Sequence, residues 1–212
     1  MQVAIPIFPQ LTALDAIGPY EVLQRVPEAD LVFVGEHRGE VRTENGFLGL
    51  TADATYAEVP APDVVVVPGG IGTRALLSGG PLLDWLRAVH PGTRWTTSVC
   101  TGALLLAAAG LLDGLPATTH WSATGLLAEL GAVPVPERVV LNPAERVITA
   151  AGVSSGIDMA LRLLELLVDE TAARAAQVLI EYDPEPPFDS GHPSRADAAV
   201  MARVAEFQRL RR

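Results

Sequence analysis

The sequence predicts an α/β fold, a parallel-sheet sandwich with helices on both faces. Strand-like apolar runs alternate with amphipathic helical patterns along the chain, which is typical of a parallel sheet covered on both sides. The four consecutive valines Val64–Val67, bounded by Asp63 and the Pro68–Gly70 turn, indicate a central parallel strand. The run Trp95–Val99 leads directly into a helical pattern at Gly102, as expected at a strand–helix junction of such a sheet.

The other elements follow the same alternation. Strands are expected at 2–8, 31–34, 47–51, 64–67, 95–99, 139–141 and 147–150. Helices are expected at 13–25, 81–89, 102–109, 122–130, 157–168, 171–180 and 195–209. The segment 182–193 is rich in Pro, Gly and Asp and predicts a surface loop. Since no linker divides the 212 residues, a single domain over 1–212 is expected.

Composition excludes several classes of protein. The formal net charge is −10, so binding to nucleic acid by counterion release is not expected. One cysteine excludes an internal disulfide. The N-terminus has no basic leader, and the apolar stretches are interrupted well before the ~20 residues of a membrane span, so neither a signal peptide nor membrane insertion is expected. A cytoplasmic location is the default expectation.

The only cysteine, Cys100, is the first candidate catalytic residue. In Thr97–Ala103 an apolar strand passes through small residues into a helix, and Cys100 stands where the chain must turn. This pattern predicts a nucleophile elbow with Cys in place of Ser. A helix N-terminus behind the sulfur favours the reactive thiolate. The alternative interpretation is a buried, inert cysteine.

A glycine-rich turn, Pro68–Gly72, follows the valine strand at its carboxyl end. Ligands of open α/β sheets bind at that edge, and backbone N–H groups of such a turn can face a developing negative charge. The alternative is an ordinary tight turn. The turn does not match a Walker or dinucleotide-binding pattern, so no nucleotide cofactor is expected.

Asp15 is the candidate acid–base residue. It stands among apolar neighbours just after the first strand, where burial would raise its pKa and suit it to proton transfer. An aspartate at a helix start that complements the helix dipole is an equally good interpretation. His120 could serve as a base for Cys100, although a packed pocket histidine is the simpler interpretation. No Cys, His and carboxylate cluster has metal-ligand spacing, so no metal is expected.

Five segments occur in the order found in one known superfamily. They are the first strand with Asp15, Val-Val-Pro-Gly-Gly at 66–70, Ser-Val-Cys-Thr-Gly at 98–102, Thr-Thr-His-Trp at 118–121 and Ala-Gly-Val-Ser-Ser-Gly-Ile-Asp at 151–158. Over nearly the whole chain the sequence resembles the DJ-1/PfpI superfamily, which implies a flavodoxin-like, class I glutamine-amidotransferase-like fold.

Within that superfamily the chain is most similar to the isocyanide hydratases. Asp15 stands where many DJ-1-like members have Glu, and Thr101 follows the nucleophile where PfpI-type proteases have His. The loop 182–191 also resembles a segment of the hydratases. The absence of His after Cys100 argues against a protease-like Cys–His dyad.

The resemblance implies hydration of an isocyanide by water to an N-substituted formamide, without a cofactor. Cys100 would attack the terminal carbon to give a thioimidate, Asp15 would be the general acid and base, and Thr101 would orient Asp15, water or the adduct. The substrate-binding residues implied are Gly70, Ile71, His120, Trp121 and Val153. The resemblance also implies a homodimer.

Other functions remain open at this point. The same scaffold could act on carbonyl or amide substrates, as a glyoxalase-like or amidase enzyme would. Cys100 could instead be the oxidisable residue of a redox or small-molecule sensor. The core also resembles the N-terminal domain of AraC-type regulators, but only one helical pattern follows it and the chain is acidic, so DNA binding is not expected.

Overall fold

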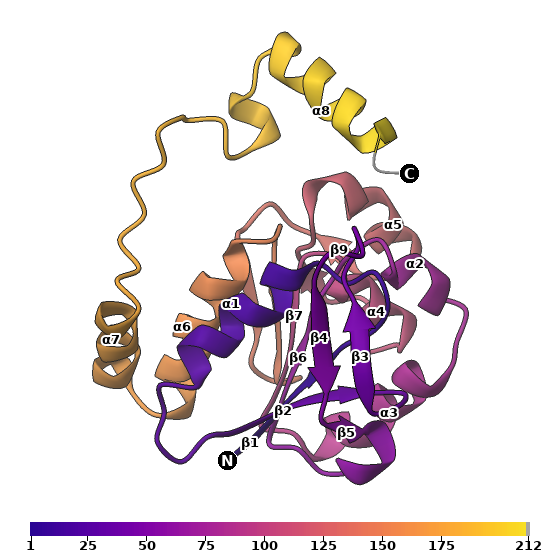
Figure 1. The fold of residues 1–212 in the computed structure, drawn as a ribbon, viewed down its shortest axis with the longest axis vertical. Coiled ribbons are helices and arrows are strands. Elements are labelled where there is room, and N and C mark those ends of the chain that lie inside the picture. The colour runs from indigo at the N-terminus through magenta and orange to yellow at the C-terminus, as the bar shows by residue number, and fades with distance from the viewer. Residues whose placement is uncertain (211–212) are drawn as a thin grey trace. The chain divides into compact units, whose positions relative to one another are not determined.

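The structure is a computed structural model that describes residues 1–210. The chain forms two compact units, residues 1–180 and the segment from Glu181 onward. The first unit contains the sheet and the helices that cover it. The second contains the 3-10 helix η4 (Pro193–Arg195) and the helix α8 (Ala198–Leu210), drawn in yellow in Figure 1. The single domain expected over 1–212 stays a prediction.

A seven-stranded sheet forms the centre of the first unit. The strands in spatial order are β10 (Val139–Asn142), β11 (Val147–Ala150), β7 (Trp95–Val99), β6 (Val64–Val67), β1 (Gln2–Pro6), β2 (Asp30–Gly35) and β5 (Ala54–Thr55). All neighbours are parallel except β10 and β11. The turn between those two strands is too short for a crossover, so they form a hairpin at the sheet edge. The predicted α/β fold is confirmed, with this antiparallel edge added.

Helices cover both faces of the sheet, as Figure 1 shows. One layer consists of α1 (Ala13–Leu23), α6 (Ser155–Leu167) and α7 (Glu170–Leu179), which pack on one another. The other consists of α2 (Thr73–Leu76), α3 (Pro81–Val89), α4 (Gly102–Ala108) and α5 (Thr124–Glu129). The 3-10 helices of this unit are η1 (Tyr56–Glu58), η2 (His90–Gly92) and η3 (Trp121–Ala123). No helix within residues 1–210 is long and apolar enough to cross a membrane.

The helix α4 is almost completely buried. Its residues from Gly102 to Ala107 are all buried, which is the property of a helix inside a core rather than on a surface. The strand β7 in front of it is buried from Thr96 to Val99. The turn between β7 and α4 is therefore fixed on both sides by closely packed structure, which matters because Cys100 lies in that turn.

Some predicted boundaries were wrong. β3 (Gly39–Arg42) and β4 (Gly49–Ala52) form a hairpin. β4 overlaps the strand predicted at 47–51, whereas β3 was not predicted. The two-residue strands β8 (Pro116–Ala117) and β9 (Val133–Pro134) were not predicted. The last helix begins at Ala198 rather than near 195, because Pro193–Arg195 form the separate 3-10 helix η4.

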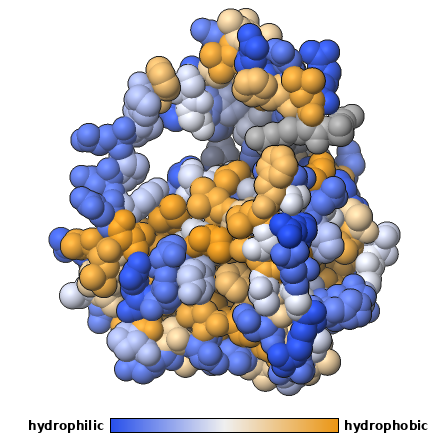
Figure 2. All heavy atoms as spheres, in the orientation of Figure 1, coloured by the Kyte–Doolittle hydropathy of each residue, from blue (hydrophilic) through white to orange (hydrophobic). Residues whose placement is uncertain are grey.

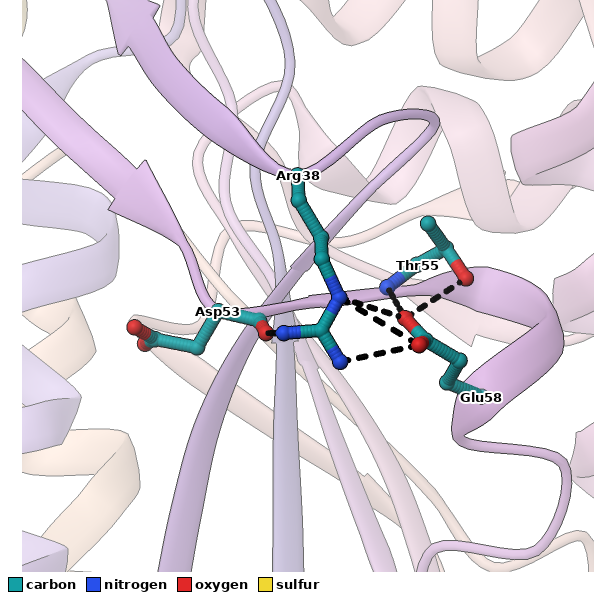
Figure 3. A network of polar contacts seen from close by, with 4 residues as sticks. All are labelled: Arg38, Asp53, Thr55 and Glu58. Carbon is teal, nitrogen blue, oxygen red and sulfur yellow. Dashed lines mark hydrogen bonds and ion pairs between the residues drawn. The ribbon is translucent and has the colours of Figure 1, made fainter.

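A polar network holds the β5 edge of the sheet in place (Figure 3). The guanidinium of Arg38 lies between the backbone carbonyl of Asp53 and the carboxylate of Glu58, and Glu58 also accepts hydrogen bonds from Thr55. These contacts lower the pKa of Glu58 to about 2. The network is exposed and lies on the η1 turn, so its role is to hold this edge rather than to do chemistry.

Candidate active site

Cys100 lies at a sharp turn between β7 and α4. Its φ is 57°, a left-handed conformation that costs a non-glycine residue about 1–3 kcal/mol and is typical of functional turns. The surrounding structure compensates: the Cys100 N–H donates to the carbonyls of Ala150 (3.1 Å) and Ala151 (2.8 Å). The Thr119 hydroxyl donates to the Cys100 carbonyl at 2.8 Å. The sharp strand-to-helix turn predicted at Cys100 is confirmed, and the role of its sulfur as a nucleophile stays a prediction.

Gly102 allows this turn to pack against the neighbouring strand. A Cβ atom there would lie 2.2 Å from the carbonyl oxygen of Val67 on β6, a distance that no side chain tolerates. Because the backbone of α4 meets β6 so closely at this point, the residue must be glycine for the elbow to hold its position.

Asp15, in the first turn of α1, is completely buried. Its Oδ2 accepts a hydrogen bond from the Gly69 N–H at 2.9 Å, whereas its buried Oδ1 has no partner at full hydrogen-bond geometry. The carboxylate also interacts with the Cys100 thiol. Of the two interpretations open from the sequence, the structure favours a carboxylate directed into the site over one that serves its own helix.

Burial changes the proton affinity of both groups. It raises the pKa of Asp15 to about 7, against the opposing hydrogen bond from Gly69. Burial and the adjacent Asp15 carboxylate raise the pKa of Cys100 to about 12, against the hydrogen bonds from the Val153 and Thr101 backbone. Desolvation therefore outweighs the helix N-terminus that was expected to favour a thiolate. Above pH 7 the pair retains one proton, which can lie on sulfur or on oxygen.

Thr101 connects the elbow to the glycine turn. Its hydroxyl accepts from the Gly70 N–H at 2.9 Å and lies 3.1 Å from the Gly70 carbonyl, to which it can donate. Gly70 has a φ of 129°, and a Cβ at Gly69 would lie 2.5 Å from the Thr101 nitrogen. Gly70 was expected to offer its N–H to substrate, but in this structure Thr101 uses that donor. Ile71 is next to it and is 57% exposed.

His120 and Trp121 follow Thr119, whose hydroxyl donates to the Cys100 carbonyl. The His120 Nδ1 is 2.7 Å from the Ser122 hydroxyl, and the His120 ring lies against Trp121 with centroids 5.2 Å apart. Burial lowers the pKa of His120, which keeps the ring neutral. A Cβ at Gly152 would lie 2.7 Å from Cδ2 of the His120 ring, so the ring packs on that backbone. The packed pocket histidine is therefore favoured over a base for Cys100.

Val153, a predicted substrate-binding residue, contributes its backbone to the candidate site. Its backbone N–H bonds to the Cys100 sulfur and lowers the pKa of the thiol. Its φ is 23°, which is strained for a β-branched residue. No local sequence pattern signals this donor, because its position depends on how β11 and α6 meet. Within residues 1–210 no group of three or more His, Cys, Asp or Glu side chains could hold a metal ion.

Comparison with known proteins agrees with this geometry. The DJ-1/PfpI family model matches residues 1–166. The isonitrile hydratase of Pseudomonas putida is 42% identical over 201 residues, which cover 95% of this chain and 87% of that protein. A ThiJ/PfpI family protein from Pseudomonas syringae superimposes with a TM-score of 0.91 at 36% identity, over 97% of this chain and 85% of that one.

A more distant structure shares the fold alone. Drosophila melanogaster DJ-1beta superimposes with a TM-score of 0.76 at 22% identity, over 85% of this chain and 97% of that one. The match to the family model agrees with the strand order and with the strained turn at Cys100. The chain belongs to the DJ-1/PfpI family.

Proposed function

We propose that the protein is an isocyanide hydratase, which converts an isocyanide and water to an N-substituted formamide. The observation that carries the proposal is the buried Asp15 carboxylate beside Cys100, because this pair can supply both the nucleophile and the proton that the reaction needs. The 42% identity to the P. putida isonitrile hydratase supports it independently.

The first half of the reaction forms a covalent adduct. Asp15 takes the thiol proton, and the Cys100 sulfur attacks the terminal carbon of R–N≡C. Asp15 returns that proton to the same carbon, which gives the thioimidate R–N=CH–S–Cys100 without gain or loss of electrons. The Val153 N–H stabilises the sulfur while it carries negative charge.

The second half releases the product. Asp15 takes a proton from water as the hydroxide adds to the thioimidate carbon, and it delivers that proton to nitrogen. The C–S bond then breaks, the hydroxyl proton returns through Asp15 to sulfur, and R–NH–CHO departs. Thr101 orients Asp15 and the water, since its hydroxyl is the polar group held next to them by Gly70.

The remaining residues shape the space for the organic substituent. Ile71 and Trp121 are exposed apolar side chains that we assign to this role, and Trp121 lies against the His120 ring. Gly70 and Val153 contribute backbone rather than side chains, the first through Thr101 and the second at the sulfur.

The test is direct turnover. Purified protein mixed with cyclohexyl isocyanide should produce N-cyclohexylformamide, followed by its formyl proton signal in NMR spectra. Methylglyoxal in a parallel reaction tests the alternative of a carbonyl substrate. Formation of lactate without any formamide would overturn the hydratase proposal.

The pH dependence of this turnover follows from Asp15. Because its pKa is raised to about 7, a second proton enters the Asp15–Cys100 pair below that pH and removes the base. We expect kcat/KM to fall about tenfold per pH unit below pH 7 and to be constant above it. His120→Gln should leave the inflection in place, since burial lowers the pKa of His120. A flat profile from pH 5 to 9 would contradict the role of Asp15.

We propose a homodimer assembled through an apolar surface on α6 and α7. Leu166, Val168, Val178 and Leu179 are between 41% and 78% exposed there. Figure 2 shows apolar side chains gathered over the region where Figure 1 places α1, α6 and α7. Exposed apolar area of this kind favours association with a second copy.

The cytoplasmic location stays a prediction.

Light scattering measures the assembly. One chain has a mass of 22.3 kDa, and we expect twice that mass for the unmodified protein. For Leu179→Asp we expect the measured mass to shift toward that of one chain. Thr171→Asp, a polar change at an exposed position on the same helix, should leave the dimer intact. A mass of one chain at micromolar concentration would contradict the homodimer.

A further inference from the structure

Arg74 is tied to the active site through consecutive hydrogen bonds. It lies on α2, directly after the glycine turn whose Gly70 is bonded to Thr101. Thr73 is fully buried and donates from its hydroxyl to the Gly70 carbonyl at 2.8 Å. The Arg74 Nη1 in turn donates to the Thr73 hydroxyl at 2.9 Å. The guanidinium is thus held from the same turn that positions Thr101 next to the nucleophile.

The charge of Arg74 acts on two residues of the candidate site. It interacts electrostatically with Cys100, and it contributes to the lowered pKa of His120. Cys100 is the proposed nucleophile, and the His120 ring packs on the Gly152 backbone and on Trp121. A positive charge that acts on both groups lies close to the path of a substrate bound at the sulfur.

Arg74 is not neutralised by the protein itself. Within residues 1–210 it has no carboxylate partner, whereas arginines such as Arg25, Arg38 and Arg138 form ion pairs. A guanidinium has five N–H donors in a planar fork, and only the bond to Thr73 is made here. Arg74 is exposed to solvent, so the remaining donors of its guanidinium are open to an anion that arrives with the substrate.

We propose that Arg74 selects isocyanides whose nitrogen substituent ends in a carboxylate, such as isocyanoacetate. The inference rests on the proposed hydratase function and names the substrate class of that same site. The terminal carbon would meet Cys100, the short methylene part would lie along Ile71, and the carboxylate would take paired N–H donors from Arg74. The overall charge of −10 repels anions, so this local positive charge would decide the selection.

The experiment compares two substrates that differ in charge. Potassium isocyanoacetate and its neutral methyl ester are each hydrated by the unmodified protein and by Arg74→Gln, and kcat/KM is measured from formamide production. We expect the unmodified protein to prefer the anion by about tenfold or more, as charge-assisted hydrogen bonds allow. Arg74→Gln should remove this preference by lowering kcat/KM for the anion alone, and Arg74→Lys should restore part of it.

Controls separate the possible failures. Arg25→Gln removes an exposed positive charge at the end of α1 and should leave the preference unchanged. The protein could hydrate cyclohexyl isocyanide and the ester but show no preference for the anion. That result would overturn the inference and leave the hydratase function standing. An equal loss for both substrates in Arg74→Gln would also overturn it. No turnover of any isocyanide would overturn the proposed function and this inference with it.

Discussion

Replacement of Cys100 by Ala should reduce formamide production to the uncatalysed background, a loss of at least about 10⁴-fold in kcat. The sulfur is the only group at the strained turn that can bond to the isocyanide carbon, and the N–H of Val153 and the Asp15 carboxylate both act on it. Initial rates with cyclohexyl isocyanide measure the loss.

The Cys100→Ala variant also has a built-in control for folding. The turn is fixed by backbone hydrogen bonds to Ala150 and Ala151 and from Thr119, none of which involves the sulfur. The circular dichroism spectrum and the melting temperature should therefore stay close to those of the unmodified protein. Formamide production by a folded Cys100→Ala variant at more than a few per cent of the normal rate would exclude covalent catalysis by this residue.

Asp15→Asn should reduce kcat by about 10² to 10⁴-fold, since it removes the carboxylate that moves the proton between sulfur, carbon and water in the proposed reaction. The amide has nearly the same shape and can still accept the hydrogen bond from Gly69. The loss should therefore appear in kcat more than in KM. Steady-state kinetics with cyclohexyl isocyanide separate the two, and near-normal kcat would remove Asp15 from the mechanism.

The same substitution should stabilise the fold at alkaline pH. The pKa of Asp15 is raised from 3.8 to about 7 in the folded state, so the folded state binds more protons between these values. The free energy of unfolding therefore decreases as pH rises through that window, by on the order of 4 kcal/mol. Asn carries no charge, so Asp15→Asn should be more stable than the unmodified protein at pH 8.

Denaturant unfolding at two pH values checks this effect. At pH 8 the variant should unfold at a higher guanidinium concentration than the unmodified protein, and near pH 4 most of that difference should disappear. An equal difference at both pH values would show that Asp15 carries no buried charge. Together, a loss of kcat and a gain of stability would identify Asp15 as a residue kept for function at a cost in stability.

The buried strands could be predicted from the sequence because local features define them. Val64–Val67, Trp95–Val99 and Val147–Ala150 have the same bounds in the prediction and in the structure. Each is a run of mostly apolar or β-branched residues with turn signals at its ends. In contrast, β8 and β9 are two residues long and pair only because the fold brings them together, so no local pattern identifies them.

The site was predictable in part for the same reason. Cys100 and Asp15 each stand close to the carboxyl end of a strand, so a parallel sheet brings them to one edge. The Val153 N–H and the Arg74 guanidinium could not be inferred, since their positions depend on a strained backbone and on a chain of hydrogen bonds between elements. The raised pKa of Cys100 was also missed, because the depth of burial is a property of the whole fold.

The central claim is that Cys100 bonds covalently to the isocyanide carbon, and intact-mass spectrometry after rapid acid quench tests it most directly. The unmodified protein should gain the full mass of cyclohexyl isocyanide during turnover, with the addition on the peptide that contains Cys100, and Cys100→Ala should gain nothing. Steady formamide production by the unmodified protein with no such adduct at any quench time would contradict the account.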